Sequence, residues 1–442
     1  MNEIEQRLTE LEQLGLSRHL RMVSGPQGPR VVLDGKPVLL LCSNNYLGLA
    51  DHPRVREAAA EAARQWGAGA GASRLVSGTM TIHRRLEQHL AAFHRAESCV
   101  LFGSGYLANL GVIGALVGRG DTIYSDELNH ASIIDGCRCS RAQVIVYRHR
   151  DVEHLDWLMR RDADEASQSE DDTRDKHTRI SDDDVGARGA RITRGAAHRK
   201  VIVTDSVFSM DGDVAPLTEI AELAHRHGAR TLVDEAHAIG VLGPGGRGAV
   251  AQAGLEDEVD VVIGTLGKAL GSYGAYACAS EETVRYLINT ARSLIFSTAP
   301  PPPSIAGALA ALELLEEKPH RVQRLRSNAR VLRRALAAEG MGIEDVEMHI
   351  VPIIVGEERA AVGLCEAILQ RGVFAQAIRP PTVAQGTSRL RLAVMATHTA
   401  DELREAARTI GQAARELDLD LRAADTQPVG AASLEPGLAR AA

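Results

Sequence analysis

The segment TLVDEAHAIGVLG, residues 231–243, begins as a short apolar run and turns polar where that run ends. The run closes at Asp234, and the tetrapeptide Asp234-Glu235-Ala236-His237 has the same letters as the nucleotide-hydrolysing strand of one group of helicases. An acid at the end of an apolar strand is typical of ligand sites at the carboxyl edge of a parallel sheet. The segment therefore predicts a sheet with chemistry at one edge, either hydrolysis of a nucleoside triphosphate or another reaction.

Composition and motifs argue against a nucleotide hydrolase. The formal net charge is -8 and aromatic residues make up 3% of the chain, so both the basic surface and the stacking side chains for nucleic acid are scarce. The nearest candidate for a P-loop is VIGTLGKAL, where Val262 replaces the first glycine and Ala269 replaces the hydroxyl residue that holds magnesium. We therefore expect no nucleic-acid partner and no triphosphate hydrolysis.

Outward from this segment, short apolar strands alternate with helical patterns between about residues 50 and 300. The predicted strands end at Gly, Ser, Asp or His, as in SCVLFGSG, DTIYSD, AQVIVYRH, KVIVTDS, ARTLVDEAH and VDVVIGTLGKALG. This alternation predicts an α/β fold with a mostly parallel sheet covered by helices. Before it, residues 1–30 predict one amphipathic helix followed by the breaker SGPQGPR, and RVVLDGKPVLLLCS predicts two strands around a turn at Asp34-Gly35.

The chain is expected to divide into an N-terminal helix and strand segment (1–45), a large domain (46–300), a smaller C-terminal α/β domain (301–420) and a flexible tail (421–442). One stretch of the large domain differs from the rest: residues 162–184 hold ten acidic residues, and residues 185–200 hold five basic ones. With almost no apolar side chains, this stretch buries too little surface to offset the entropy of ordering. We interpret 162–199 as a disordered surface insertion.

Targeting and metal-binding signals are missing from the sequence. No run reaches the ~18 apolar residues that a membrane span needs. The N-terminus MNEIEQRLTELEQLG lacks the apolar region of a signal peptide, and the six cysteines lack the paired C-x-x-C spacing of a zinc site. We expect a cytoplasmic protein with no membrane partner and no metal.

The polar residues at the predicted strand ends match the needs of pyridoxal 5'-phosphate. That cofactor needs a lysine for a Schiff base, an acid that keeps its pyridine nitrogen protonated, and a cradle for its phosphate. Lys268 lies in the glycine-flanked loop GTLGKALGSYG, Asp234 ends a strand, and His237 is a candidate partner for the phenolic oxygen. Gly105 and Tyr106 stand at a predicted helix start, where free N–H groups attract phosphate. In this order, the residues predict a pyridoxal phosphate site.

A set of longer motifs indicates the family to which the chain is similar. The motifs are CSNNYLGLADHP, GAGAGASRLVSGT, HRRLEQHLAAF, LFGSGYLAN, DELNHASIIDG, TDSVFSMDGDVAPL, VDEAHAIGVLG, GTLGKALGSYG and FSTAPPP. With them the chain resembles the α-oxoamine synthases over roughly residues 15–415, apart from the insertion. The resemblance implies a fold-type-I pyridoxal phosphate transferase, an acyltransferase that condenses an amino acid with an acyl thioester and releases carbon dioxide.

The resemblance also implies roles for residues that bind the cofactor. Lys268 would form the Schiff base and act as the base, Asp234 would pair with the ring nitrogen, and His130 would stack on the ring and touch the substrate. The other cofactor-binding residues would be Gly105, Tyr106, Ser209, His237 and Thr265, with Thr265 at the phosphate.

For the substrates, the resemblance implies that Arg391 grips the carboxylate of the amino acid with its two-pronged guanidinium and that Asn44 assists it. Arg21 and Thr382 would contact the acyl substrate. It further implies a homodimer with sites at the interface.

Substrate identity depends on the block AIRPPTVAQGTSRLRLAVMATHT, residues 377–399. This block is most similar to family members of biotin biosynthesis, which join L-alanine to a pimeloyl thioester and release 8-amino-7-oxononanoate. The carrier of the acyl group, coenzyme A or an acyl carrier protein, stays open. Two alternatives are a 2-amino-3-ketobutyrate coenzyme A ligase and a 5-aminolevulinate-type synthase, both of which use glycine. A third is a catalytically inactive protein that kept the fold, and the presence of Lys268, Asp234 and His237 argues against it.

Overall fold

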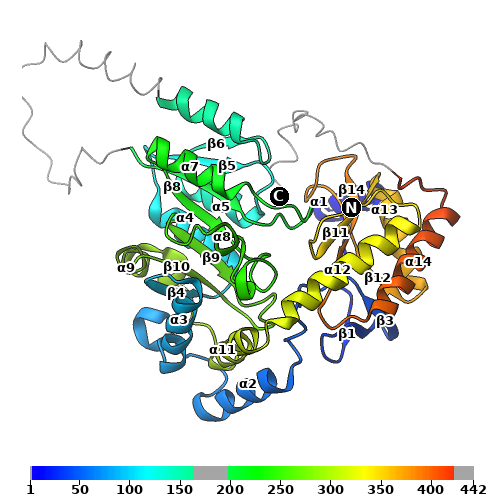
Figure 1. Cartoon of the computed structure of the whole chain (residues 1–442), viewed down its shortest axis with the longest axis horizontal. Coiled ribbons are helices and arrows are strands. Elements are labelled where there is room, and N and C mark those ends of the chain that lie inside the picture. Colours follow the sequence, from blue (N-terminus) through cyan, green and yellow to red (C-terminus); the bar gives the residue numbers. More distant parts are fainter. Residues whose placement is uncertain (1, 164–197, 423–442) are drawn as a thin grey trace, which may run out of the picture.

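The largest sheet of the protein has seven strands in the order β4-β10-β9-β8-β7-β5-β6, in a computed structural model that describes residues 2–163 and 198–422 (Figure 1). The strands are β4 (Ser98–Phe102), β5 (Thr122–Asp126), β6 (Gln143–Tyr147), β7 (Lys200–Asp205), β8 (Arg230–Asp234), β9 (Val261–Thr265) and β10 (Ala275–Ala279). Only β10 runs against its neighbours, β4 and β9. The prediction of an α/β fold with a mostly parallel sheet is confirmed.

Helices cover both faces of this sheet, which is why its inner strands are buried along their whole length rather than on alternate residues. Strands β5 and β10 are buried at every position. The surrounding helices are α2 (Pro53–Trp66), α3 (Thr81–His94), α4 (Gly105–Leu116), α5 (Ala131–Ser140), α7 (Leu217–His227), α8 (Ala249–Ala253), α9 (Glu281–Thr290) and α10 (Arg292–Ile295), with the short turns η1 (Arg74–Gly78) and η2 (Pro244–Gly246). Helix α4 is apolar nearly all round because it packs against both α5 and the sheet.

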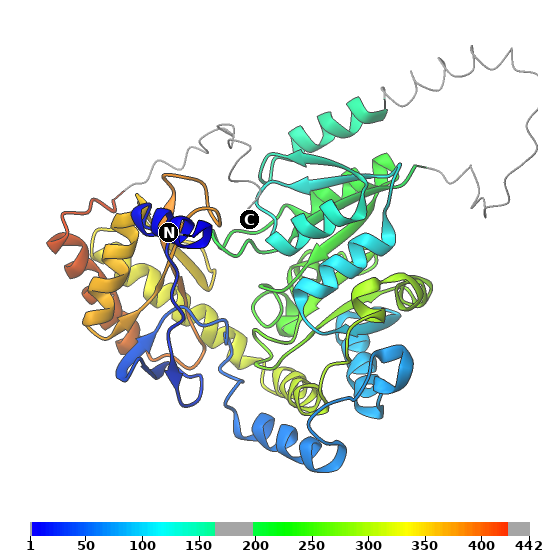
Figure 2. The same cartoon turned by 180° about the vertical axis from the view of Figure 1, so that it is seen from behind.

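The N-terminal strands join the C-terminal part of the chain. β2 (Arg30–Leu33) and β3 (Lys36–Leu40) form the predicted hairpin, and its two turn residues both have positive φ, 48° at Asp34 and 81° at Gly35. Positive φ at both positions is what a tight two-residue hairpin turn requires. β1 (Val23–Ser24) extends this pair on one side, and β12 (Val373–Phe374) pairs in parallel with β3 on the other. Figures 1 and 2 show these strands beside the C-terminal helices, away from the seven-stranded sheet.

A third sheet completes the smaller part of the molecule. It has the antiparallel order β11-β14-β13, formed by β11 (Ile350–Gly356), β13 (Gln376–Ile378) and β14 (Ser388–Ala393). The helices α12 (His320–Ala338), α13 (Glu358–Gln370) and α14 (Ala400–Glu416) accompany it (Figure 1). Helix α11 (Pro302–Glu317) packs on α2 and α3 instead, beside the large sheet. A domain boundary near residues 300–320 stays a prediction.

The helix predicted before the breaker SGPQGPR is shorter than expected. Helix α1 spans Glu3–Gln13, and Gly15 follows it with a φ of 68°, a left-handed conformation that ends a helix. None of the residues in α1 is buried. The apolar spacing does indicate a helix here, but Gly15 in its left-handed conformation ends that helix early.

Both ends of the predicted insertion are packed. The hydroxyl of Tyr124 donates to Asp162 at 2.7 Å, and Lys200 pairs with the same carboxylate at 3.5 Å. Arg199 pairs with Asp121 at 2.8 Å. The boundaries 162–199 are therefore too wide, because buried polar partners hold their first and last residues. Residues 164–197, on which the prediction of disorder mainly rests, lie outside the described residues.

The tail predicted from residue 421 begins slightly later, since Leu421 is buried and its carbonyl accepts a hydrogen bond from the amide of Gly342. Residues 423–442 lie outside the described residues. Across the described ranges 2–163 and 198–422, no helix combines the length and apolar character needed to cross a membrane.

Candidate active site

The predicted site residues gather at the carboxyl edge of the parallel strands. Asp126, Asp205 and Asp234 end the neighbouring strands β5, β7 and β8, and Asp205 lies directly opposite Asp234 in the strand register. Lys268 follows β9, the next strand of the sheet. Parallel strands present their carboxyl ends on one side, so four successive strands bring these residues to one place.

Lys268 is the centre of this group. Its Nζ lies 2.7 Å from Nε2 of His237, and Nδ1 of His237 lies 2.6 Å from the hydroxyl of Tyr46. Burial lowers the pKa of Lys268 to about 8, although the carboxylates of Asp234 and Asp205 act in the opposite direction. A lysine with a pKa near neutral is available both as a nucleophile and as a base.

Asp234 is held by two hydrogen bonds and is 4% exposed. The side-chain amide of Asn109 donates to Oδ2 at 2.7 Å, and the backbone amide of Ala236 donates to Oδ1 at 2.8 Å. Both bonds favour the ionised carboxylate. Burial, followed by the charge of Asp234, raises the pKa of the adjacent Asp205 well above its ordinary value. Asp234 is thus fixed in orientation at the end of β8 by two donors.

His130 begins helix α5 and is positioned by its backbone. Its amide donates to Oδ2 of Asp205 at 2.7 Å, and Nδ1 of the ring lies 2.7 Å from the hydroxyl of Ser132. Ser132 in turn accepts from Asn109 at 2.9 Å. The ring of His130 remains exposed, which leaves it able to stack on a planar ligand.

Arg391 is a buried cation on β14. Both terminal nitrogens lie 3.4 Å from Oδ1 of Asn44, and Nε donates to the carbonyl of Ser209. Arg389, two residues earlier on the same face, pairs with Asp211. Among the described residues, no carboxylate lies within ion-pair distance of Arg391. A buried guanidinium without a counter-ion favours an anionic ligand.

The predicted phosphate cradle lies at the start of α4. Gly105 is the first residue of that helix, and a Cβ added there would meet nothing within 4 Å. The space beside Gly105 is therefore open, while the amide of Leu107 in the same turn donates to the hydroxyl of Ser104 at 3.2 Å. Thr265 ends β9, and its hydroxyl accepts from the amide of Gly267 at 3.2 Å. Tyr106 is largely exposed, and its hydroxyl donates to Asp135 on α5.

Arg21 and Thr382 do not contact this group. Arg21 pairs with Glu366 and, at 3.5 Å, with Asp34. Thr382 is exposed in the turn after Pro381, and its amide donates to the carbonyl of Arg379. Their contact with an acyl substrate stays a prediction.

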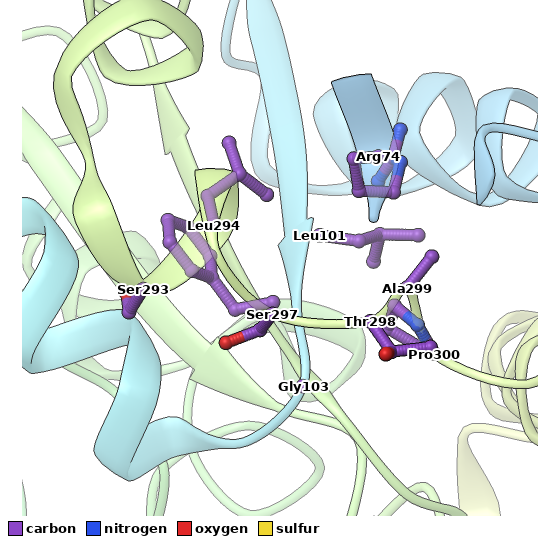
Figure 3. Close-up of a pocket in the computed structure, with 10 residues that line it drawn as sticks. Arg74, Leu101, Gly103, Ser293, Leu294, Ser297, Thr298, Ala299 and Pro300 are labelled. Carbon is purple, nitrogen blue, oxygen red and sulfur yellow. The ribbon is translucent and has the colours of Figure 1, made fainter. Parts of the chain in front are cut away.

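A separate hollow lies between η1, β4 and α10 (Figure 3). Its cavity volume is about 10 Å³, and it is lined by Arg74, Leu101, Phe102, Gly103, Ser293, Leu294, Ser297, Thr298, Ala299 and Pro300. None of the predicted site residues lines it. Its volume is below the roughly 300 Å³ at which ligand pockets usually begin, so we do not place the active site there.

Three residues of the site were not singled out from the sequence: Tyr46, Asn109 and Asp205. Tyr46 stands inside the motif CSNNYLGLADHP, and Asn109 is four residues after Gly105 and so on the same face of α4. Asp205 ends its apolar strand just as Asp234 ends the next one. Each had a signal in the sequence, but their partners lie more than 25 residues away along the chain.

Sequence comparisons match most of the chain to known proteins. Residues 36–410 match the family model described as aminotransferase class I and II. A relative from Citrifermentans bemidjiense, named 8-amino-7-oxononanoate synthase, is 47% identical over 94% of this chain and 99% of its own length. Relatives of the same name from Geobacter metallireducens and Anaeromyxobacter dehalogenans are 47% and 48% identical over 90% of this chain and over 95% and 91% of their own lengths.

Solved structures share the fold. A serine palmitoyltransferase from S. paucimobilis, solved with bound pyridoxal phosphate joined to myriocin, has a TM-score of 0.82 at 30% identity and covers 94% of this chain and 98% of its own. An 8-amino-7-oxononanoate synthase from Francisella tularensis has a TM-score of 0.67 at 25% identity over 86% of this chain and 98% of its own. Both are similar to this chain over most of its length.

Proposed function

The chain belongs to the aminotransferase class I and II family, and we propose that it is a pyridoxal phosphate-dependent acyltransferase that condenses L-alanine with a pimeloyl thioester. The products are 8-amino-7-oxononanoate, carbon dioxide and the free thiol carrier, a step of biotin biosynthesis. The observation that carries the proposal is the identity of 42–48%, over nearly the whole chain, to relatives that share the name 8-amino-7-oxononanoate synthase.

The residues of the site fit the cofactor. A phosphate fits the open space before the first turn of α4, whose Gly105 leaves room for a close approach. A pyridine ring needs an ionised acid, which Asp234 provides with two hydrogen bonds to its oxygens. An aldehyde needs an amine, and Lys268 is a part-buried lysine whose pKa is lowered to about 8. Ser209, His237 and Thr265 complete the proposed set.

Pyridoxal phosphate, when bound, supplies an electron-withdrawing ring that stabilises negative charge on the carbon next to the amino nitrogen. The protein's part is to hold and move protons around that carbon. Lys268 takes the proton from Cα of the amino acid, since it is the basic group at the centre of the site. Asp234 keeps a proton on the ring nitrogen, because a buried carboxylate stabilises a cation beside it.

L-Alanine is bound by its carboxylate. Arg391 offers two terminal nitrogens as a fork and has no counter-ion among the described residues, and Asn44 stands within 3.4 Å of both nitrogens. The ring of His130, which is exposed, would stack on the ring of the cofactor. Arg21 and Thr382 are the proposed contacts for the acyl chain, and the carrier of that chain, coenzyme A or an acyl carrier protein, is open.

Other family members use L-serine or glycine as the amino acid, and the proposal has to be distinguished from both. The structure of the serine palmitoyltransferase has a higher TM-score to this chain than that of the 8-amino-7-oxononanoate synthase from Francisella tularensis. Its sequence, however, is 30% identical to this chain, whereas the relative from Citrifermentans bemidjiense named 8-amino-7-oxononanoate synthase is 47% identical. Family members that use glycine differ from the proposed enzyme by one methyl group in the amino acid. One methyl in a pocket is worth about 1–3 kcal/mol, so discrimination against glycine should be about 10- to 200-fold.

The test is a product assay with purified enzyme. L-Alanine, glycine and L-serine are each paired with pimeloyl, succinyl, acetyl and palmitoyl thioesters, and kcat/KM is measured for every pair. L-Alanine with a pimeloyl thioester should be the best pair, with slow turnover of glycine. Glycine with acetyl-coenzyme A or succinyl-coenzyme A as the best pair would assign the chain to the alternative synthases, and L-serine with palmitoyl-coenzyme A to the palmitoyltransferases.

Assembly and location are further parts of the proposal. A homodimer is supported by large apolar side chains that stand exposed on single chains, such as Ile4 and Leu8 of α1, Val76 and Phe296. Light scattering after size exclusion should give twice the chain mass. We also propose a cytoplasmic location, which cell fractionation tests.

A further inference from the structure

Tyr46 is a buried tyrosine whose single hydroxyl contacts three polar side chains of the site. Its Oη lies 2.6 Å from Nδ1 of His237, 3.1 Å from Oδ1 of Asn44 and 3.5 Å from Nη2 of Arg391. Nε2 of the same histidine lies 2.7 Å from Nζ of Lys268. We propose that Tyr46 is a positioning residue: its hydroxyl fixes the ring tautomer of His237 and so makes Nε2 an acceptor for the Lys268 ammonium group.

Only one assignment of hydrogens satisfies all of these contacts. An ammonium group has donors and no acceptor, so Nε2 of His237 must offer a lone pair. Burial and the charge of Lys268 lower the pKa of His237 well below its ordinary value, so the ring is neutral and its single hydrogen is on Nδ1. That hydrogen is donated to Tyr46, and the tyrosine hydrogen goes to Asn44, which already accepts from Arg391.

Water has no room to replace the hydroxyl. Tyr46 is 0% exposed and His237 is 5% exposed. The ring of His349 stands edge-on against Tyr46, with 4.1 Å between the ring centroids and 74° between the planes. Removing the hydroxyl therefore leaves Nδ1–H of His237 without a partner in a buried site, and an imidazole that donates no hydrogen bond is a poorer acceptor at its other nitrogen.

Of the remaining charges around Lys268, Arg391 is the one that bonds to this hydroxyl. Carboxylates face Lys268 from β7 and β8, and cationic or titratable groups face it from β14, from the start of α5 and from the start of β11: Asp205, Asp234, Arg391, His130 and His349. A Tyr46→Phe change removes one bond of Arg391, the 3.5 Å contact from its Nη2, and leaves its bonds to Ser209 and Asn44 in place. It should weaken the acceptor for the ammonium group and lower the pKa of Lys268 by about one unit, which is the scale of one polarised hydrogen bond.

The chain freed of cofactor provides a direct measurement. The unprotonated amine of Lys268 attacks the aldehyde carbon of added pyridoxal phosphate, a C=N bond forms and water leaves, with a yellow product. The pH at which the capture rate is half-maximal therefore reports proton loss from Lys268. In Tyr46→Phe this midpoint should fall by about one pH unit.

Tyr276→Phe is the matched control. Tyr276 is also 0% exposed, and its hydroxyl lies 2.8 Å from Nε2 of the buried His94, so the change removes the same kind of bond elsewhere in the core. Its capture midpoint should equal that of the unmodified chain. Equal midpoints in Tyr46→Phe and Tyr276→Phe would overturn the proposal, because any loss of packing is common to both.

A second measurement uses the unmodified chain and does not depend on whether Tyr46→Phe folds. Nitrogen-15 NMR of the chain without cofactor, with His237→Gln to assign the signals, should show a protonated Nδ1 and an unprotonated Nε2 below the Lys268 pKa of about 8. A protonated Nε2 would overturn the proposal. The inference rests on the proposed cofactor site, but neither measurement uses the acyl substrates. A failed product assay therefore leaves the role of Tyr46 unaffected. If the unmodified chain does not capture pyridoxal phosphate, the proposed cofactor is contradicted, and the NMR measurement still decides the tautomer of His237.

Discussion

Asn109 holds the carboxylate of Asp234 through a hydrogen bond of 2.7 Å between Nδ2 and Oδ2. Asn109 lies on α4, one turn after Gly105 at the proposed phosphate cradle, and Asp234 ends β8. The two elements are far apart in the chain, so this bond sets the orientation of the acid relative to the helix that would bind the phosphate. Because Asn109 supplies a donor to a buried carboxylate, its loss should affect the chemistry of the ring nitrogen.

Asn109→Ala should keep the fold and the cofactor and lose about 10- to 100-fold in kcat, since a hydrogen bond to a charged group is worth about 1.5–3 kcal/mol. Asn109→Asp should lose more, because it replaces the donor to Asp234 with a second, repelling carboxylate at the same position. Steady-state kinetics with bound cofactor checked by absorbance would measure both. A kcat in Asn109→Asp equal to that of the unmodified enzyme would mean that Asp234 does not serve the ring nitrogen.

Lys268→Ala should abolish turnover and leave the circular dichroism spectrum unchanged, because one side chain supplies both the covalent attachment and the base. Borohydride should trap the cofactor on the unmodified chain and not on the variant. Lys318→Ala, on an exposed residue that follows α11, is the control and should behave as the unmodified chain. Measurable condensation by Lys268→Ala would refute its assignment.

Arg391→Lys should raise the KM for L-alanine at least about tenfold, with a small change in the KM for the acyl thioester. A lysine is a point charge and cannot keep the fork that now faces Asn44 with both terminal nitrogens. The comparison is Arg389→Lys, two residues earlier on the same strand face, whose guanidinium is already paired with Asp211. If both variants changed only the acyl KM, the carboxylate site would lie elsewhere.

His149 ties two parts of the large domain together. Its Nδ1 lies 2.9 Å from Asp126 and its Nε2 lies 2.8 Å from Asp213, on the loop that also carries Ser209. Burial alone would lower the pKa of His149, but the two carboxylates outweigh it and raise the pKa of His149 to about 9. For Asp213, burial alone would raise the pKa, but His149 outweighs it and lowers the pKa. At neutral pH the imidazolium therefore donates to both acids.

The sign of the pH dependence follows from these shifts. The folded-state pKa of His149 lies above its ordinary 6.5, so its contribution to stability is complete below pH 6.5 and is lost as the pH rises through about 9. His149→Gln should thus reduce the free energy of unfolding by about 2 kcal/mol at neutral pH, after allowance for partial exposure. Thermal melting from pH 5 to 10 should show the gap closing above pH 9. His225→Gln, on the exposed side of α7, should show no such trend; a gap that stays constant to pH 10 would contradict the ion pairs.

The sequence predicted the local features well. Apolar runs rich in β-branched residues predicted the strands of the large sheet, and the acids and glycines after them predicted where ligands would bind. The hairpin at Asp34-Gly35 followed from turn chemistry alone. Periodicity made the N-terminal helix too long, because Gly15 ends it. Composition failed at Asp162, where a partner from a distant strand orders a residue of a charge-rich stretch.

By itself, the sequence determined which strands and turns form and which residue types end them, because these depend on neighbours along the chain. Only the tertiary structure decided which strand ends are adjacent: Asp205 opposite Asp234, and Val373 beside Leu39. It also decided that Tyr46 reaches His237 and that Arg391 reaches Asn44. The physical reason is that such contacts join segments brought together by burial of separate helix and sheet faces, so no local pattern of residues encodes their distances.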